Sequence, residues 1–413
     1  MVSSRVCCTK NWGDYMDIVY ECESGKIIHG DNLAVLDTIS DNSVDSCISD
    51  FPYAIDFMGK CWDSYKTNFY TWCNDRANSL LRVLKPGGYV AIFGHPKTNH
   101  RMKCAFEDAG FRIVEEIDWV YLTGMPKNQD IKKLIDANPT DPDPVLSKLW
   151  DGWKTAGLKP AHEPITVFQK PLDGTYVENI EKYGCGGMNI DACRVAMSKD
   201  DHDMIDAKAS KNPTVGYWCK DDHIYGDYAM SFASPSHKLG RFPMNMILSE
   251  DVCDLIDMQT GITKSTGGTG FASRSNRCKN TYGMFKATDE YINDSLGGYG
   301  DVGGGSRMFT VIKYCPKPSP SEKLLPDGSR NTHVTVKPVD LIKWLVMLLT
   351  PKSGTTIDIT AGSCTHAVAC EELNRNFGYD LTWIDVELMN SNTEPYCEIG
   401  KKRMSQSRQC KLF

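Results

Sequence analysis

Two stretches of this chain alternate short apolar runs with amphipathic segments, and this alternation limits the fold more than any other feature. The first stretch runs from Lys26 to about Leu172, and the second begins at Met308. Such alternation is typical of the strands and helices of an α/β domain. We therefore expect one α/β domain whose two halves lie far apart in the sequence.

Apolar periodicity places the individual elements within both stretches. In the first we expect strands at 26–29, 44–49, 89–93, 113–121 and 165–169, with helices at 32–39, 68–84 and 98–109. The composition of Lys85-Pro86-Gly87-Gly88 predicts a turn. In the second we expect strands at 309–314, 355–359 and 381–386, a helix at 339–349, and another helix beginning near 365.

Between about Asp173 and Ser306 the periodicity weakens, while Gly, Ser, Asn and Thr accumulate at 261–270 and 297–305. This composition is typical of a loop-rich insertion or a separate module. We therefore divide the chain into four parts: 24–172, 173–306, 307–403 and a basic tail at 404–413. The first and third parts would build the α/β domain.

The composition excludes several classes of protein. Of the 413 residues, 41% are hydrophobic and 24% are charged, which fits a globular chain rather than a disordered tail or a disulfide miniprotein. No apolar run approaches the roughly 18 residues of a membrane span, and the first residues do not resemble a secretory signal. The 17 cysteines are then expected to be free thiols in the cytoplasm, and without CxxC pairs they indicate no metal site.

The net charge of −7 argues mildly against a nucleic-acid partner, because such proteins usually carry a basic surface. The charge is uneven, however. The segment 264–279 is locally basic, and the C-terminal end carries Lys401, Lys402, Arg403, Arg408 and Lys411 without an acid among them. Net charge therefore does not decide whether the protein binds nucleic acid.

The first motif with chemical content is Ser49-Asp50-Phe51-Pro52-Tyr53, at the end of an apolar strand. Strand ends of this kind are where open α/β sheets bind ligands. A carboxylate and a nearby backbone carbonyl can both accept hydrogen bonds from an exocyclic amine, while an aromatic ring stacks on the base that carries it. The plainer alternative is a strand followed by a proline turn.

The second motif, Asp358 to His366, is again a strand followed by a turn of small residues and a helix. Small residues let the backbone approach a ligand, and a helix N-terminus offers free N–H groups. Farther along, Glu387 ends the next strand, where an acid can bind a pair of ribose hydroxyls. A purely structural turn and an exposed strand-end acid are the alternatives.

The third motif is 331–338, which leads into the apolar helix at 339–349. Pro338 suits the first turn of a helix, where its missing N–H costs nothing. Lys337 and His333 could orient the carboxylate of an amino-acid-like ligand. Alone, the segment predicts only a helix start.

Together, these motifs resemble the DNA amino-methyltransferases of the permuted (beta) class, in which the catalytic tetrad precedes the cofactor turn. The resemblance covers nearly the whole chain. Its blocks are Gly30-Asp31, 45–63, Arg82 to Gly88, Leu158 to Ile165 and Lys337-Pro338. The block Phe57 to Asp63 resembles a branch found often in phages and prophages.

The resemblance implies a Rossmann-like sheet that binds S-adenosylmethionine and acts on double-stranded DNA in a bacterial or phage-infected cell, with a homodimer as a further expectation. It implies that 173–306 is a target-recognition module. The catalytic residues would be Asp50, Phe51, Pro52 and Tyr53. The cofactor-binding residues would be Asp31, His333, Lys337, Asp358, Thr360, Ala361, Gly362, Ser363, Thr365 and Glu387.

Phe51 and Cys364 depart from the family pattern. Phe51 replaces the first proline of the tetrad, and Cys364 stands where a glycine is usual. A Cβ in the left-handed region costs about 1–2 kcal/mol, so Cys364 matters more. These departures leave three alternatives open: an adenine-N6 enzyme, which Asp50 favours; a cytosine-N4 enzyme; and a catalytically weakened DNA-binding protein. An enzyme acting on RNA or a protein amide is a further, less favoured alternative.

Overall fold

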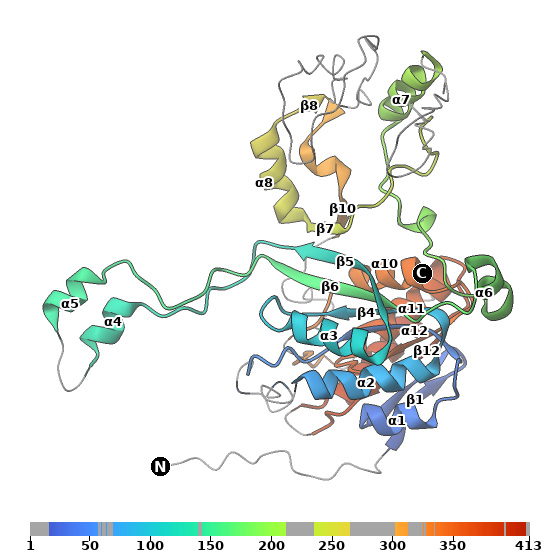
Figure 1. The fold of residues 1–413 in the computed structure, drawn as a ribbon, viewed down its shortest axis with the longest axis horizontal. Coiled ribbons are helices and arrows are strands. Elements are labelled where there is room, and N and C mark those ends of the chain that lie inside the picture. Colours follow the sequence, from blue (N-terminus) through green and yellow to red (C-terminus); the bar gives the residue numbers. More distant parts are fainter. Residues whose placement is uncertain are drawn as a thin grey trace, which may run out of the picture. The chain divides into compact units, whose positions relative to one another are not determined.

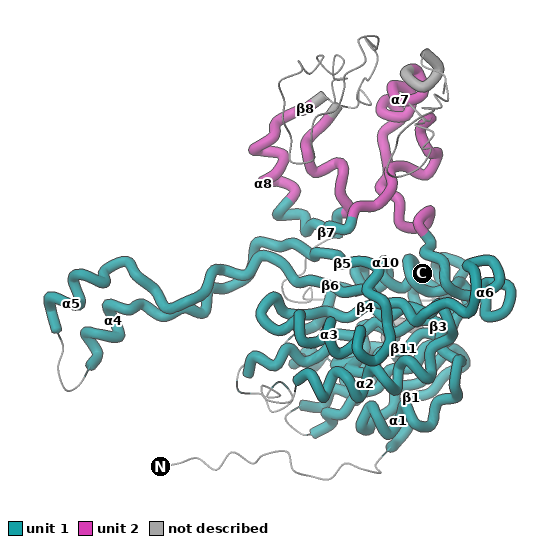
Figure 2. The backbone as a smooth tube through the Cα atoms, viewed as in Figure 1, with its two compact units in different colours: residues 1–189, 245–252, 311–413 teal, residues 190–244, 253–310 magenta. Residues whose placement is uncertain are grey.

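The computed structural model describes residues 16–56, 59, 63, 69–138, 143–211, 235–264, 302–312, 325, 328–333, 335–391 and 394–409. The chain divides into two compact units (Figure 2). The first comprises Met1–Asn189, Asn245–Val252 and Val311–Phe413, and the second comprises Ile190–Met244 and Cys253–Thr310. The expected block Phe57 to Trp62, apart from Gly59, lies outside the described residues.

A ten-stranded sheet forms the framework of the first unit (Figure 1). Its strands, in spatial order, are β1 (Met16–Cys22), β2 (Gly25–Gly30), β12 (Thr382–Glu387), β11 (Thr355–Asp358), β3 (Val44–Asp50), β4 (Leu84–Phe93), β6 (His162–Gln169), β5 (Arg112–Val120), β7 (Met246–Ser249) and β10 (Thr310–Ile312). The five strands from β2 to β4 run parallel, and β6 is antiparallel to β4 and β5. The expected α/β fold is therefore confirmed, with β11 and β12 inserted between β2 and β3.

Helices cover both faces of the parallel strands. The described helices of the first unit are α1 (Asn32–Thr38), α2 (Phe69–Val83), α3 (Asn99–Ala109), α6 (Tyr176–Tyr183), α10 (Val339–Leu349), α11 (Thr365–Asn376) and α12 (Tyr396–Gln409), besides two in an arm. Successive side chains of a strand point to opposite faces. On β3, Cys47 packs in the apolar core shared with α1, α2 and α3, whereas the Ser46 hydroxyl bonds the Thr350 hydroxyl (2.7 Å) just after α10.

Most predicted elements are present, but the turn expected at Lys85 to Gly88 is wrong. Those residues lie within β4, where pairing with β3 shifts register between Val44 and Ser46. Gly87, at φ +81°, lets the extended chain accommodate this irregularity without reversing. Composition alone cannot distinguish a bulge from a turn, since both favour glycine.

An arm leaves the sheet between β5 and β6 and carries two short helices, α4 (Ile131–Asp136) and α5 (Pro144–Leu149) (Figure 1). Asp130 and Asp143 cap these helices by accepting hydrogen bonds from backbone N–H groups of the first turn. Both caps follow the usual preference for Asp at this position. The sequence pattern did not predict either helix, because each is shorter than two turns.

The second unit contains α7 (Lys199–Lys211), most of α8 (Glu250–Thr260), and the paired strands β8 (Thr263–Lys264) and β9 (Val302–Gly303). Asp257 on α8 accepts hydrogen bonds from the backbone N–H and the hydroxyl of Ser306, both at 2.8 Å. Most of the glycine-rich segments at 261–270 and 297–305 lie outside the described residues. Among the described helices, none is both long and apolar enough to cross a bilayer.

Candidate active site

The ends of β3 and β11 lie side by side because the two strands are parallel neighbours. Ser46 pairs with Thr356, and Cys47 pairs with Ile357. Beyond this ladder, the Ser49 hydroxyl donates to Asp358 Oδ1 at 2.6 Å. The first two motifs thus meet at one edge of the sheet, although Ser49 and Asp358 are 309 positions apart in the sequence.

A cavity of about 1200 Å³ opens at this edge, entirely within the first unit. All four tetrad residues line it, as do all ten residues that the sequence assigns to the cofactor. Cys364, between two of the lining residues, does not. One cavity therefore brings together the full set of expected site residues.

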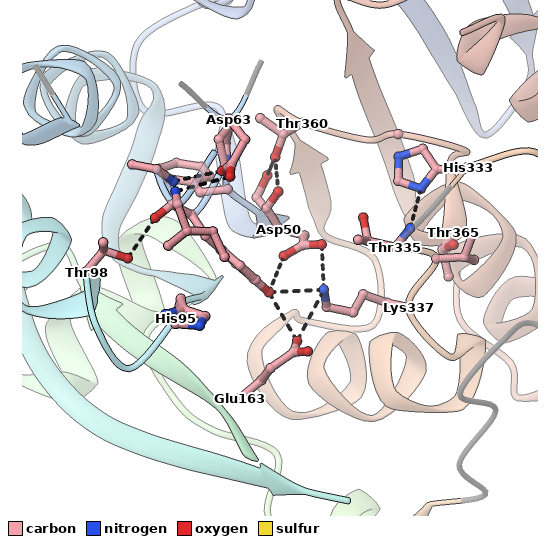
Figure 3. Close-up of a pocket in the computed structure, with 18 of the residues that line it drawn as sticks. Asp50, Asp63, His95, Thr98, Glu163, His333, Thr335, Lys337, Thr360 and Thr365 are labelled. Atoms are coloured by element: carbon pink, nitrogen blue, oxygen red, sulfur yellow. Dashed lines mark hydrogen bonds and ion pairs between the residues drawn. The ribbon is translucent and has the colours of Figure 1, made fainter. Parts of the chain in front are cut away.

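Asp50, at the end of β3, has both carboxylate oxygens engaged (Figure 3). Tyr53 donates its hydroxyl to Oδ1 at 2.9 Å, and Lys337 Nζ donates to Oδ2 at 2.5 Å. Burial raises the pKa of the Asp50 carboxyl above its ordinary value, while the Lys337 ammonium opposes that rise. Lys337 therefore favours the ionised form, which can accept further hydrogen bonds.

Glu163 joins the same cluster from the start of β6. Its Oε2 lies 3.3 Å from Lys337 Nζ and 3.1 Å from the Tyr53 hydroxyl, and its Oε1 accepts from the Tyr121 hydroxyl at 3.1 Å. The Lys337 ammonium thus contacts two partly buried carboxylates. Burial lowers the pKa of Lys337, but Asp50 and Glu163 outweigh it, and the net shift is upward.

Lys337 lies at the cavity as expected, but its contacts were not foreseen from the sequence. The sequence suggested that its ammonium would orient the carboxylate of an amino-acid-like ligand; in the structure that ammonium contacts Asp50, Glu163 and Tyr53 instead. Pro338 N-caps α10 and so fixes the lysine just before the helix. The sequence motif predicted that Lys337 lies at the cavity, but it did not predict which residues its ammonium contacts.

The backbone around the tetrad is held by hydrogen bonds from three directions. Thr360 Oγ1 donates to the Asp50 carbonyl at 3.0 Å, and Thr98 Oγ1 donates to the Tyr53 carbonyl at 2.8 Å. Asp63 accepts from the N–H groups of Ala54 and Ile55 at 2.8 and 3.1 Å. These bonds hold the loop that carries the tetrad at the cavity, and Figure 3 shows Thr98, Thr360 and Asp63 on different sides of it.

Phe51 replaces the family's proline without filling the pocket. Its side chain is 2% exposed and its ring packs edge-on against Trp72, with centroids 5.1 Å apart, and at a tilt against Phe106. Within the described part of the chain, no hydrogen bond reaches the Phe51 carbonyl oxygen. The acceptor that the chemistry needs is therefore retained.

Cys364 adopts the left-handed conformation, with φ +58° and ψ +46°, that usually requires glycine. Its side chain is fully buried and points toward α12, where a Cβ on Gly400 would lie 2.4 Å from Cys364 Sγ. The Cβ strain costs about 1–2 kcal/mol. The sulfur does not occupy the cavity.

The neighbouring Gly362 has φ +52° and faces the cavity wall. A Cβ there would lie 2.5 Å from His333 Nε2, so only glycine fits. Its N–H donates to Glu387 Oε2 at 2.7 Å, and Met389 N–H donates to Glu387 Oε1 at the same distance. Burial raises the pKa of the Glu387 carboxyl to about 8, although these two backbone hydrogen bonds lower it.

The other residues expected at the cofactor also hold defined places. Asp31 caps α1 by accepting from Leu33 N–H at 2.9 Å, and its second oxygen lies 3.9 Å from Arg76 Nη2. The ring of His333 packs against Tyr396 with centroids 4.4 Å apart. Burial, and then the nearby Asp385, raises the pKa of Asp358 to about 7.

Two contributors to the site were missed from sequence. Glu163 lies in the block Leu158 to Ile165, but the sequence does not show that β6 runs antiparallel to β4, and only that direction brings the first residues of β6 to the carboxyl edge of the sheet. Arg403, grouped with the basic end of the chain, is buried and donates to the Ser363 carbonyl at 2.7 Å and to Thr365 Oγ1 at 2.9 Å. The sequence features that could have indicated them are an acid at the start of a strand, for Glu163, and a basic residue on an amphipathic helix, for Arg403.

Comparison with known proteins identifies the class. The N6/N4 DNA methylase family model matches residues 44–393, and the chain belongs to that family. Among its relatives, the type II methyltransferase M.HindIII of Haemophilus influenzae is 26% identical over 203 residues. That match covers 40% of this chain and 64% of M.HindIII.

Solved structures give more distant similarities. The cytosine-N4-specific PvuII DNA methyltransferase aligns with 95% of this chain and 89% of its own, at 12% identity and a TM-score of 0.47. M1.HpyAVI in its complex with SAM aligns with 92% of this chain and 99% of its own, at 14% identity and a TM-score of 0.38.

Proposed function

We propose that this protein is an S-adenosylmethionine-dependent DNA methyltransferase that methylates the N6 amine of an adenine extruded from double-stranded DNA. The observation that carries the proposal is the single cavity shared by Asp50 and the turn from Asp358 to Thr365. Family membership supports the same activity. The loop-rich segment 173–306 is then the target-recognition module.

The cavity suits S-adenosylmethionine. Glu387 is a buried carboxyl group beside which no cation lies among the described residues, and each of its oxygens accepts one backbone hydrogen bond. A carboxylate oxygen has room for a second donor, so a ribose hydroxyl pair would solvate this acid. The glycine at 362 keeps the adjacent wall free of side chains. Asp31 would bind near the adenine moiety, and His333 near the amino-acid part.

When bound, the cofactor supplies an electrophilic methyl group, and the chain must hold the base amine, which is the nucleophile, in line with it. The amine of a base is a poor nucleophile because its lone pair is delocalised into the ring. The Asp50 carboxylate and the Phe51 carbonyl accept its two N–H groups and so favour the pyramidal nitrogen. Tyr53, held through its hydroxyl and its carbonyl, offers its ring for stacking.

Lys337 and Glu163 act as positioning residues for Asp50. Lys337 favours the ionised form of the Asp50 carboxyl, and Glu163 holds the lysine and the Tyr53 hydroxyl in place. Both residues act through Asp50 rather than on the base. No covalent intermediate is needed, since methyl transfer from a sulfonium is a direct displacement.

The choice of adenine over cytosine depends on Asp50, because Asp at the first tetrad position is commoner in adenine-N6 enzymes of this family. Both amines need the same two acceptors, and cytosine N4 is the alternative target. Incubating the purified protein with unmethylated plasmid DNA and isotope-labelled cofactor, followed by mass spectrometry of the nucleosides, distinguishes them. Labelled N6-methyladenine supports the proposal, labelled N4-methylcytosine corrects the target, and no labelled nucleoside on DNA of varied sequence rejects the activity.

A catalytically weakened DNA-binding protein is the second candidate, motivated by the departures at Phe51 and Cys364. Neither side chain blocks the cavity, because the Phe51 ring packs in the core and the Cys364 sulfur points toward α12. Calorimetry with S-adenosylmethionine separates the two candidates. Tight cofactor binding counts against the weakened protein, and its absence together with salt-sensitive DNA binding supports it.

A further inference from the structure

Three exposed lysines line the cavity where it opens to solvent: Lys97, Lys127 and Lys159. Two of them influence the half-buried His95 beside them, whose pKa is lowered first by burial and then by Lys97 and Lys127. The chain as a whole carries a net charge of −7, so this concentration of positive charge is local. A phosphate backbone is the kind of ligand that such a cluster attracts.

Two apolar side chains stand among these lysines at the same opening. Leu158 is 94% exposed and Met125 is 77% exposed, yet both line the cavity. We call these five residues, Lys97, Met125, Lys127, Leu158 and Lys159, the cavity mouth. Large apolar side chains so exposed beside a site for a base are typical of a surface covered by a partner.

The backbone holds the cavity mouth in a defined geometry at the root of the arm. Tyr121 N–H donates to the Ala161 carbonyl at 2.9 Å, and Asn128 Nδ2 donates to the Gly157 carbonyl at 3.1 Å. Between these bonds the two segments approach so closely that a Cβ on Gly124 would lie 1.9 Å from the Pro160 carbonyl oxygen. Leu158 therefore lies on a short segment that hydrogen bonds hold on both sides, at Gly157 and Ala161, rather than at a free loop tip.

We propose that the cavity mouth binds duplex DNA around the extruded base, with the three lysines on the flanking phosphates and Leu158 in the space that the base leaves in the stack. This inference rests on the proposed function, which requires the base to leave the helix. Unstacking a base costs free energy, and proteins that deform DNA often insert an apolar side chain between bases to offset that cost. Leu158 is the most exposed apolar side chain at the opening, and lysines flank it.

The first test compares Leu158→Ala with Leu149→Ala, an arm leucine that is 72% exposed but does not line the cavity. The substrate is a duplex carrying the site mapped in methylated plasmid DNA. We expect Leu158→Ala to lower kcat/KM on the paired duplex by roughly tenfold, and a mispaired target base to restore most of it, since a mispaired base is easier to extrude. Leu149→Ala should match the native protein on both substrates.

An equal loss with both leucine variants, or a Leu158→Ala loss that a mispaired target does not restore, would overturn the assignment of Leu158. Unchanged kcat/KM for Leu158→Ala would do the same. Melting temperatures serve as the folding control, since both leucines are exposed. A change in oligomeric state with Leu158→Ala would instead assign the cavity mouth to a second copy of the chain.

The second test does not depend on methylation and so separates failure of this inference from failure of the proposed function. Binding of the native protein to a non-specific duplex is measured against salt concentration. Lys127→Ala and Lys159→Ala should each reduce the slope of log affinity against log salt by about 0.9, the value for one lost phosphate contact. Lys148→Ala, on α5 away from the cavity, should leave the slope unchanged; equal slopes for all the variants would contradict the inference.

Discussion

Asp50 has two charged neighbours with opposite effects on the pKa of its carboxyl. Lys337 lowers the pKa of its carboxyl, and Glu163 raises it. Burial is larger than either effect and leaves the pKa above the ordinary value of 3.8. A carboxyl accepts hydrogen bonds from an amine only when ionised, so activity should be lost as the pH falls through this raised pKa.

Removing the carboxylate itself should separate chemistry from binding. Asp50→Ala should lower kcat by about 10²- to 10³-fold, the usual cost of losing one group that stabilises a transition state. Affinity for S-adenosylmethionine, measured by calorimetry, should remain close to native, because Asp50 lies on β3 and the cofactor turn follows β11. A parallel loss of cofactor affinity would mean that Asp50 supports the pocket rather than the base.

The two neighbours of Asp50 should move the pH profile in opposite directions. Lys337→Met removes the cation and should shift the acidic limb of kcat to higher pH. Glu163→Gln removes the second carboxylate and should shift that limb to lower pH. Lys343→Met is the control, since this lysine pairs with Asp340 and Glu372 on the surface of α10 and α11 and does not line the cavity. Shifts in the same direction would refute the positioning roles.

At the scale of elements, the cofactor turn depends on backbone conformations as much as on side chains. Gly362→Ala should weaken S-adenosylmethionine binding by more than about tenfold, because its Cβ would meet His333 as well as adopt a strained φ. Gly378→Ala has a similar φ of +69°, but no atom lies within 4 Å of its Cβ. The second variant should lose stability without losing cofactor affinity, as calorimetry and thermal melting would show.

The sequence predicted elements best where local periodicity determined them. The helix at 339–349 and the strand at 44–49 were found almost to the residue, since their apolar patterns are unambiguous. Strand β1, helix α12 and the arm helices were missed because they are exposed, short or rich in charge. The tetrad and the cofactor turn were recognisable as strand ends, but the Asp50–Lys337–Glu163 cluster depends on strand direction and long-range packing that no local pattern encodes.

For the whole molecule, the buried acids of the cofactor pocket link stability to pH. The pKa of Glu387 is raised to about 8 and that of Asp358 to about 7, so the folded chain holds these protons more tightly than the unfolded chain. Their contribution to the free energy of unfolding is complete below the ordinary carboxyl range and is lost as the pH rises through 7 and 8. Stability should therefore fall in mildly alkaline solution.

Thermal melting across this range tests the linkage. The melting temperature of the native protein should fall between about pH 6 and about pH 9, and that of Glu387→Gln should fall less, because the variant has no proton to lose there. Glu178→Gln, in the exposed capping box of α6, should follow the native slope. Identical slopes for all three proteins would show that Glu387 does not titrate in this range.

The insertion of β11 and β12 between β2 and β3 has a consequence for biogenesis. When a nascent chain has been made only as far as β4, β3 has no partner on one side. That partner, β11, lies some 310 positions later in the sequence. Unpaired strand edges invite association with other chains, and such distant pairings form slowly. Yield during rapid expression should accordingly depend on chaperones or low temperature, whereas the folded protein has these strands paired.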